Sequence, residues 1–165
     1  MSSSTPEPLT AAVLTVSDSS ARGERSDLSG PAVGEALRLA GFEVVAKEII
    51  SDDQVPIQQA IARLTEKARL VVTTGGTGIA KRDVTPEATK AVCDRLLQGV
   101  AEKMRLEGGK KTRFAALSRG ICGVRGQSVI LNLPGSPNGA VDSLNAVIDL
   151  MPHALQLLSG NTKHQ

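Results

Sequence analysis

The sequence is poor in aromatic residues and has little net charge. Phe42 and Phe114 are its only aromatic side chains, and Trp and Tyr are absent from all 165 residues. Proteins that bind single-stranded nucleic acid stack the bases on aromatic side chains, so such a binder is disfavoured. The formal net charge of +2 offers no general attraction to polyanions. We therefore expect neither a nucleic-acid nor a membrane partner.

Cysteine is also scarce. Cys93 and Cys122 are far apart and follow no metal-binding or redox spacing, which favours a reducing compartment. The first residues lack the apolar core of a signal peptide, and no run approaches membrane-spanning length. We predict a cytoplasmic protein with a flexible tail at residues 1–9, a single domain at 10–160 and a second tail at 161–165.

Histidine is limited to His153, within a helical pattern, and His164, near the end of the chain. Neither is expected near a cleft. Cys122 has no evident base to activate its thiol. The composition therefore argues against a serine or cysteine hydrolase.

Apolar, β-branched runs alternate with amphipathic helical patterns along the chain. This alternation predicts an α/β fold with a mostly parallel sheet and helices on both faces. Strands are expected at residues 11–16, 42–50, 70–74 and 128–133, the second of them near a sheet edge. Helices are expected from residue 29 to 40, 54 to 68, 86 to 97, after Gly99 to 109, and along 140–158, where Pro152 kinks or restarts the helix.

Polar or glycine-rich turns follow the predicted strands. In parallel sheets, ligands bind beyond the carboxyl ends of the strands, so these turns are expected to meet at one cleft. One of Asp52 and Asp53 is expected to cap the following helix, which leaves the other free, and Ser136 is expected to cap the last helix. The turns are Ser17-Asp18, residues 51–53, 75–83 and 134–138, with Ser118-Arg119 as a further candidate.

The stretch 70–89 is the centre of the pattern. Its strand runs into Gly75, Gly76, Thr77 and Gly78, where backbone N–H groups could face an anion without interference from side chains. The turn matches neither a Walker A loop nor a dinucleotide fingerprint, whose third glycine would fall on Lys81. A tight turn without a ligand is the alternative.

The presence of Asp83 favours the interpretation of this turn as a ligand-binding site. Thr85 is expected to cap the helix that begins near Pro86, so Asp83 is not needed for that task. Its carboxylate could hold a hydrated Mg²⁺ against a phosphate. A weak salt bridge to Arg82 or Lys81 is the alternative.

Glycine turns, hydroxyls, arginines and carboxylates together suit the binding of phosphates and Mg²⁺. In such sites, positioning and charge neutralisation supply most of the catalysis. An attacking phosphate is already ionised at neutral pH and needs no general base. The scarcity of histidine then fits the chemistry.

Six motifs together resemble the molybdopterin adenylyltransferase (Mog/MoaB) family over nearly the whole chain. They are VLTVSD (13–18), SDLSGP (26–31), SDDQ (51–54), VTTGGTGIAKRDVTPEAT (72–89), ALSRG (116–120) and LNLPGSPNGA (131–140). The resemblance implies a three-layer αβα fold of Rossmann-like topology, assembled as a trimer or, in some members, a hexamer. It also implies transfer of AMP from Mg-ATP to the terminal phosphate of molybdopterin, with release of pyrophosphate.

Site residues follow from the same resemblance. Asp83 would be the metal-linked catalytic acid and Asp52 its partner. The family often has Pro-Asp-Glu where this chain has Ser51-Asp52-Asp53, so Asp52 and Asp53 both stay candidates for the metal beside Asp83. The nucleotide and molybdopterin sites would comprise Ser17, Asp18, Gly75, Gly76, Thr77, Gly78, Ser118, Arg119, Pro134, Gly135 and Ser136.

The resemblance leaves alternatives in other classes. Some MoaB-type members are thought to lack the transferase activity, so a silent molybdopterin-binding module is one. A nucleotide-pyrophosphate hydrolase of the competence-damage type is another, although its GGLGPT pattern differs from the Gly-Gly-Thr-Gly-Ile-Ala sequence found at 75–80. Hand-over of the product to a molybdenum insertase is an expected partnership.

Overall fold

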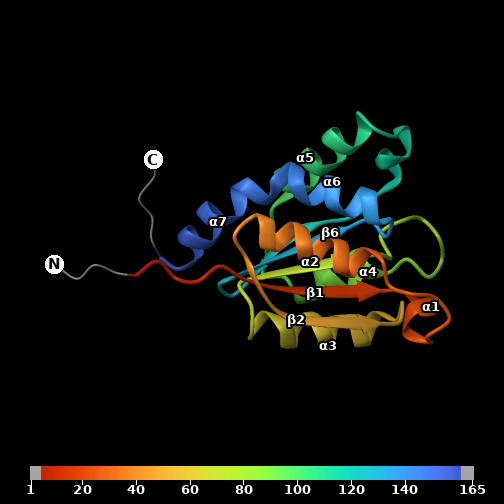
Figure 1. Cartoon of the computed structure of the whole chain (residues 1–165), viewed down its shortest axis with the longest axis horizontal. Coiled ribbons are helices and arrows are strands. Elements are labelled where there is room, and N and C mark those ends of the chain that lie inside the picture. Colours follow the sequence, from red (N-terminus) through yellow and green to blue (C-terminus); the bar gives the residue numbers. More distant parts are fainter. Residues whose placement is uncertain (1–4, 161–165) are drawn as a thin grey trace.

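The computed structural model describes residues 5–160, which form a six-stranded sheet in the order β2-β1-β3-β6-β5-β4 (Figure 1). The strands β1 (Thr10–Val16), β2 (Glu43–Ile50), β3 (Leu70–Thr74) and β6 (Ser128–Leu133) are parallel. The strands β5 (Cys122–Arg125) and β4 (Arg95–Leu96) extend the sheet in antiparallel pairing. The mostly parallel sheet is as predicted, with β2 at one edge.

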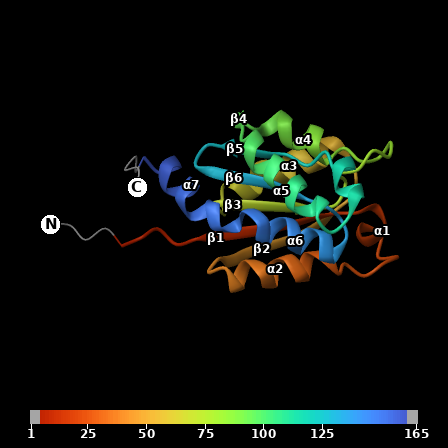
Figure 2. The ribbon, with the colours of Figure 1, turned by 90° about the horizontal axis from the view of Figure 1, so that it is seen from above.

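Helices cover both faces of the sheet, in three layers. On one face lie α2 (Ser29–Leu39), α5 (Gln98–Gly109), α6 (Pro137–Val147) and α7 (Met151–Leu158); the views show α5 and α6 side by side (Figure 2). The other face carries α3 (Gln54–Thr65) and α4 (Thr85–Val92). The short helices are α1 (Asp18–Ala21), η1 (Arg113–Leu117) and η2 (Ile148–Leu150).

Alternate residues of each central strand fill two separate cores. Val13 and Val72 pack under α2 and α6, whereas Leu14 and Val71 pack against α3. Because successive side chains of a strand point to opposite faces, a strand buried on both sides is apolar throughout. The burial of every residue of β3 and β6 follows from this arrangement.

The helix predicted over residues 86–97 is wrong beyond Val92. There the chain becomes extended at Cys93 and forms β4, because the Asp94 N–H donates to the Val124 carbonyl (2.7 Å) and the Leu97 N–H to that of Cys122 (2.8 Å). Gly99 lies inside α5 rather than ending a helix. The strand β5, which is not among the strands predicted from the sequence, supplies the pairing that overrides the helical pattern.

The C-terminal helical pattern is divided as predicted. Pro152 stands in the first turn of α7, after η2 separates α7 from α6. The Ser136 side chain caps α6 by accepting from the Gly139 N–H (3.2 Å). Proline is tolerated in a first turn because the N–H groups there have no partner within the helix.

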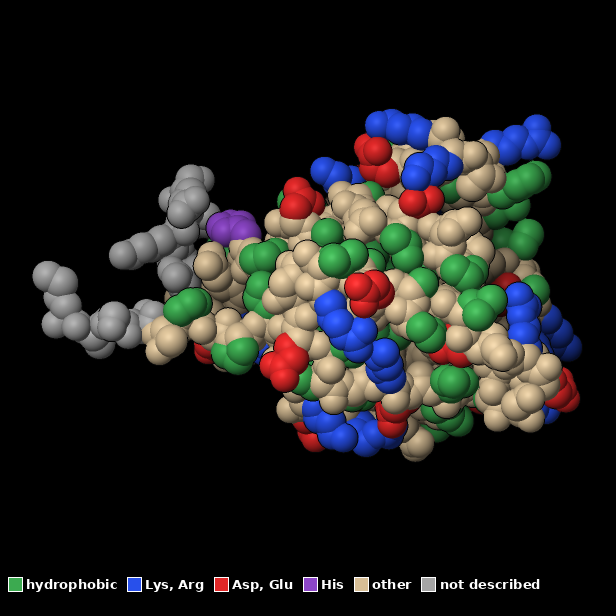
Figure 3. Space-filling view, in the orientation of Figure 1, with side chains coloured by type: hydrophobic (Ala, Val, Ile, Leu, Met, Phe, Trp, Pro, Cys, Tyr) green, Lys and Arg blue, Asp and Glu red, His purple; other side chains and the backbone are tan. Residues whose placement is uncertain are grey.

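On the face shown in Figure 3, acidic and basic side chains are interspersed, with hydrophobic groups between them. No single-sign field covers this face, in keeping with the small net charge. Within residues 5–160, none of the helices combines the length and apolar character needed to cross a bilayer.

Candidate functional site

The loops after β1, β3 and β6 meet with Asp52, after β2, around a polar cleft of about 420 Å³. They are brought together because the carboxyl ends of the four parallel strands lie at one edge of the sheet. The loop 25–29 closes another side of the cleft. The predicted site residues that line it are Ser17, Asp52, Gly75, Gly76, Asp83, Gly135 and Ser136.

Asp18 and Asp52 join the ends of β1 and β2 by reciprocal hydrogen bonds. The Asp18 N–H donates to Oδ2 of Asp52 (2.9 Å), and the Asp52 N–H donates to Oδ1 of Asp18 (3.0 Å). The Ser17 side chain accepts from the Ser20 N–H and so caps α1. These contacts fix the backbone that carries Asp52.

Asp52 and Asp83 each have one anchored and one available carboxylate oxygen. Oδ2 of Asp83 accepts from the Ala80 N–H (2.9 Å), and Oδ2 of Asp52 accepts from Asp18. Neither Oδ1 atom has a hydrogen-bond partner within residues 5–160. Both side chains line the cleft, so the available oxygens supply two anionic ligands to one space.

The pKa values of Asp18 and Asp52 are shifted in opposite directions. Burial raises the pKa of Asp52, and the negative charges of Asp18 and Asp83 add to this effect. Hydrogen bonds from Arg82 and then from the Asp52 N–H lower the pKa of Asp18 to about 2. A bound cation facing Asp52 would relieve the cost of keeping its carboxylate ionised.

Arg82 binds the two aspartates that do not line the cleft. Its Nε donates to Oδ2 of Asp18 (2.7 Å), and its NH2 donates to Oδ1 of Asp18 (2.9 Å) and to Oδ1 of Asp53 (3.1 Å). The alternative of a salt bridge between Asp83 and Arg82 or Lys81 is not found within residues 5–160. The structure thus separates Asp53 from the Asp52–Asp83 pair.

Neither predicted helix cap after β2 or β3 forms. Asp53 occupies the N-cap position of α3, but its side chain makes no capping bond because it pairs with Arg82. Thr85 lies inside α4, whose N-cap is Val84; the Thr85 hydroxyl donates to the Gly75 carbonyl (3.0 Å). Thr85 therefore stabilises the glycine turn instead of the helix.

The turn at Gly75 and Gly76 requires glycine. Both residues have positive φ, +101° and +69°. A Cβ on Gly75 would lie 2.2 Å from the Val16 carbonyl oxygen, and one on Gly76 would lie 2.2 Å from Oγ1 of Thr85 and 3.0 Å from Oδ1 of Asp52. The backbone therefore lies directly against the candidate catalytic side chain of Asp52.

The N–H groups of this turn are not equivalent. The Gly75 N–H donates to the Leu133 carbonyl (3.1 Å) and so continues the pairing of β3 with β6 beyond Thr74. No acceptor within residues 5–160 pairs with the N–H groups of Gly76, Thr77 or Gly78. Of these three residues only Gly76 lines the cleft, so its N–H, rather than the whole predicted turn, is the donor placed to meet an anion there.

Arg119 does not reach into the cleft. Its guanidinium donates to the Gly78 carbonyl (2.8 Å) and the Asp83 carbonyl (2.7 Å) and pairs with Glu87. Its N–H also donates to the Thr77 carbonyl (2.8 Å). The structure therefore shows Arg119 in contact with the loop that carries Asp83, instead of with a ligand space.

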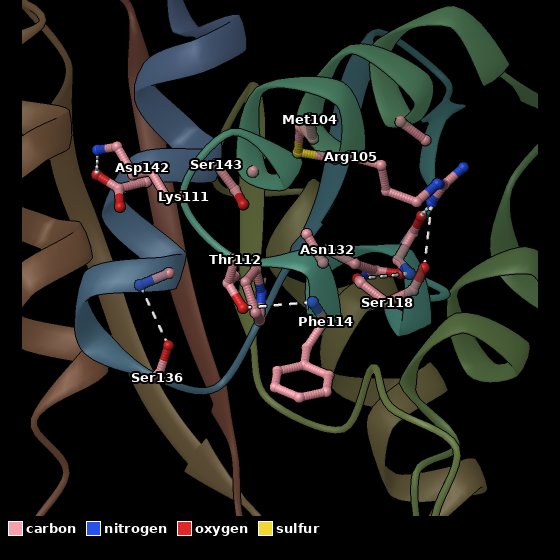
Figure 4. A pocket seen from close by; sticks show the side chains of 16 residues that line it. Met104, Arg105, Lys111, Thr112, Phe114, Ser118, Asn132, Ser136, Asp142 and Ser143 are labelled. Atoms are coloured by element: carbon pink, nitrogen blue, oxygen red, sulfur yellow. Dashed lines mark hydrogen bonds and ion pairs between the residues drawn. The ribbon is translucent and has the colours of Figure 1, made fainter.

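A second cavity of about 200 Å³ adjoins the cleft and shares Ser136 with it (Figure 4). Pro134 and Ser118, from the sequence prediction, line this cavity and not the cleft. Met104 and Ala115 contribute apolar wall. The Ser143 side chain, 8% exposed, points into the space, and its hydroxyl has no hydrogen-bond partner within residues 5–160.

Sequence reasoning missed the second cavity and part of the cleft. Met104 and Ser143 lie on helical stripes whose pattern indicates only core positions. Asp27 accepts from the Thr15 hydroxyl (2.8 Å) and the Gly30 N–H (2.9 Å), so it fixes the loop that closes the cleft. The motif 26–31 contained this signal, because an aspartate three residues before a glycine at a helix start is typical of capping.

Residues 12–153 match the family model described as "Probable molybdopterin binding domain". A molybdopterin adenylyltransferase of Helicobacter pylori is 41% identical over 153 residues, covering 90% of this chain and 87% of the relative. That of Escherichia coli K12 is 38% identical over 165 residues, covering 90% and 84%.

A solved structure is similar to this chain in both fold and sequence. A molybdopterin biosynthesis enzyme MoaB from Thermus thermophilus superposes with a TM-score of 0.87 at 49% identity, covering 92% of this chain and 97% of that one. The expected fold is thereby confirmed. The match to the family model and these similarities over whole chains show that this chain belongs to the molybdopterin adenylyltransferase (Mog/MoaB) family of molybdenum cofactor biosynthesis enzymes.

Proposed function

We propose that this protein transfers AMP from Mg-ATP to the terminal phosphate of molybdopterin. The observation that carries the proposal is that Asp52 and Asp83, each with an available Oδ1, line one cleft together with Gly76, whose N–H has no acceptor within residues 5–160. The names of the relatives support the same reaction class.

The donor set fits Mg²⁺ that enters with a nucleotide. Mg²⁺ is usually bound by one or two carboxylates together with substrate phosphates and water. Asp52 and Asp83 provide two carboxylates, and no group of three or more His, Cys, Asp or Glu side chains within residues 5–160 forms an all-protein cage. When bound, Mg²⁺ would neutralise phosphate charge. Asp53, held by Arg82, is not proposed as a ligand.

The reaction requires positioning more than proton transfer. A phosphate oxygen of molybdopterin attacks the α-phosphorus of ATP; the bond from that phosphorus to the bridging oxygen of the β-phosphate breaks, and pyrophosphate leaves. The attacking oxygen is already ionised, so no base is required. The Gly76 N–H, in the lining of the cleft, would bind a phosphoryl oxygen as negative charge develops.

The two adjoining spaces fit a reaction with two substrates. The polar cleft would hold the reacting phosphates, and the largely apolar cavity by Met104 and Ser143 would hold a flat ring of one substrate. Ser136, which lines both, stands at the junction. We assign Ser118 and Pro134 to this ring-binding side.

The deciding experiment measures pyrophosphate release from Mg-ATP with and without molybdopterin. We expect release that requires molybdopterin, falls at least 100-fold in Asp83→Asn and Asp52→Asn, and is unchanged in Asp149→Asn, which alters an exposed carboxylate on η2. Molybdopterin binding without release would favour the silent module. Release without molybdopterin would favour the pyrophosphate hydrolase.

We also propose a homotrimer that passes its product to a molybdenum insertase. The edge strand β2 exposes Val45 and Ile49, which supports association through that edge. Light scattering after size-exclusion chromatography would distinguish a trimer from a monomer or a hexamer. Product retention in a pull-down with an insertase would test the hand-over.

A further inference from the structure

Arg82 is placed to organise all four aspartates at the carboxyl ends of β1, β2 and β3. It immediately precedes Asp83, yet its side chain extends to the ends of the other two strands. Its contact with Asp18 is bidentate, through Nε (2.7 Å) and NH2 (2.9 Å), and the same NH2 reaches Asp53 (3.1 Å). A planar guanidinium can form this fork and a lysine ammonium cannot.

The contacts of Arg82 divide the carboxylates into two sets. Both oxygens of Asp18 are engaged, Oδ1 by the Asp52 N–H and by Arg82, and Oδ2 by Arg82. Asp53 is turned toward the guanidinium and does not line the cleft. Of these four side chains, only Asp52 and Asp83 keep an available oxygen in the cleft.

The same side chain links the supports of both cleft carboxylates. Through Asp18 it fixes the backbone at Asp52, because Asp18 and Asp52 exchange hydrogen bonds. Through its own backbone it fixes Asp83, the next residue. An exposed ion pair is usually worth little, but bidentate arginine contacts within a network are the exception.

We propose that Arg82 is a positioning residue that withholds Asp18 and Asp53 from the metal, so that of these four aspartates only Asp52 and Asp83 present oxygens to a cation that binds with phosphate. The role rests on the proposed function for its effect on turnover. Its effect on cation binding can be measured without any reaction.

The proposal makes an unusual prediction for Arg82→Gln: cation affinity rises while turnover falls. Without the guanidinium, Asp18 and Asp53 become available to a divalent cation, so we expect Mn²⁺ to bind the free protein at least threefold more tightly. The cation is then drawn away from the Asp52–Asp83 geometry, so kcat for AMP transfer should fall at least tenfold.

Further variants separate this role from simple loss of structure. Arg82→Lys restores charge without the fork and should recover less than half of the lost kcat. Arg82→Gln/Asp53→Asn removes one released carboxylate and should return the Mn²⁺ affinity toward that of the unmodified protein. Arg63→Gln, which breaks the two-bond pair of Arg63 with Glu48 outside the cleft, is the matched control and should change neither quantity.

Mn²⁺ binding is followed by electron paramagnetic resonance on the full chain, and exchange of the amides at 76–83 by mass spectrometry. Tighter Mn²⁺ binding with faster exchange in Arg82→Gln supports the proposal. Unchanged or weaker Mn²⁺ binding in both Arg82→Gln and Arg82→Lys, with both variants folded, overturns it. If the unmodified protein transfers no AMP, the proposed function fails, whereas the Mn²⁺ and exchange results still decide the role of Arg82.

Discussion

At the scale of single residues, the cleft depends on how closely backbone and side chains approach. Gly76 has φ of +69° and lies where a Cβ would meet Thr85 and Asp52. Gly23 has a similar φ of +73° but nothing within 4 Å of the position its Cβ would take. The two glycines therefore share a left-handed backbone and differ in what an added Cβ would meet, which makes them a useful pair for comparison.

We expect Gly23→Ala to lower the free energy of unfolding by about 1 to 2 kcal/mol, the cost of a left-handed alanine. Gly76→Ala should cost at least about 1 kcal/mol more, because overpacking adds to that strain. It should also displace Asp52 and lower AMP transfer at least tenfold, while Gly23→Ala retains activity. Urea unfolding and turnover measure both. Equal losses in the two variants would show that the contacts at Gly76 are unimportant.

The ion pair of Asp18 with Arg82 should make the free energy of unfolding depend on pH in the acid range. Its pKa is lowered from 3.8 to about 2 in the folded protein, first by the Arg82 hydrogen bonds. A lowered folded-state pKa contributes stability that is present above 3.8 and is lost as the pH falls toward 2.

The difference in unfolding free energy between the unmodified protein and Asp18→Asn should therefore be constant above about pH 5 and shrink between about pH 4 and 2. Chemical unfolding at a series of pH values gives this difference. The same series on Asp149→Asn, an exposed aspartate, serves as control. A difference that does not vary with pH would contradict the assignment of the low pKa.

At the scale of elements, the sequence predicted the four parallel strands and the meeting of their loops. Both follow from local patterns, since apolar runs and the shared edge of a parallel sheet need no knowledge of contacts. The hydrogen-bond partners of individual side chains could not be predicted from these patterns. Thr85 was expected to cap α4 but bonds to Gly75, and Arg119 was expected at a ligand but binds the loop 78–83.

These errors have one physical origin. A hydroxyl or guanidinium can satisfy its hydrogen bonds locally or with a residue brought near only by folding, and the local pattern is the same in either case. The end of α4 was missed for a similar reason. Pairing of β4 with β5, a strand that lies later in the chain beyond α5, decides where that helix stops.

Asn132 joins several elements in the core of the sheet. Its amide donates to the hydroxyls of Thr73 in β3 and Thr89 in α4, each at 2.9 Å, and its Oδ1 accepts from the Ile121 N–H (3.2 Å). Asn132→Leu keeps a similar volume but leaves the Thr73 hydroxyl and the Ile121 N–H without this partner, while the Thr89 hydroxyl retains its bond to the Thr85 carbonyl. We expect a loss of about 2 to 4 kcal/mol.

The expected loss corresponds to a Tm lower by about 5 to 15 °C for a domain of this size. Calorimetry provides the measurement, with Asn145→Leu on the exposed side of α6 as the control. A change in Tm no larger than that of the control would show that the network contributes little beyond packing.

At the scale of the whole molecule, the carboxyl and amino ends of the parallel strands differ in role: one carries the candidate site and the other carries contacts that stabilise the fold. The carboxyl ends of the parallel strands carry the cleft. At the amino ends, Arg69 donates to the carbonyls of Gln127 and Leu155, each at 2.9 Å, and pairs with Glu7. This one side chain, 18% exposed, connects the segment before β1, the β5–β6 turn and α7.

Because Arg69 lies at the end of the sheet away from the cleft, its loss should affect stability without affecting catalysis. We expect Arg69→Ala to lower the unfolding free energy by about 1 to 3 kcal/mol, since charged hydrogen bonds to carbonyls are lost. KM and kcat at room temperature should stay within twofold of the unmodified values. Arg38→Ala, which breaks an exposed pair with Glu35 on α2, should change neither. A fall in kcat for Arg69→Ala at full occupancy of the folded state would instead show that the two ends are coupled through the sheet.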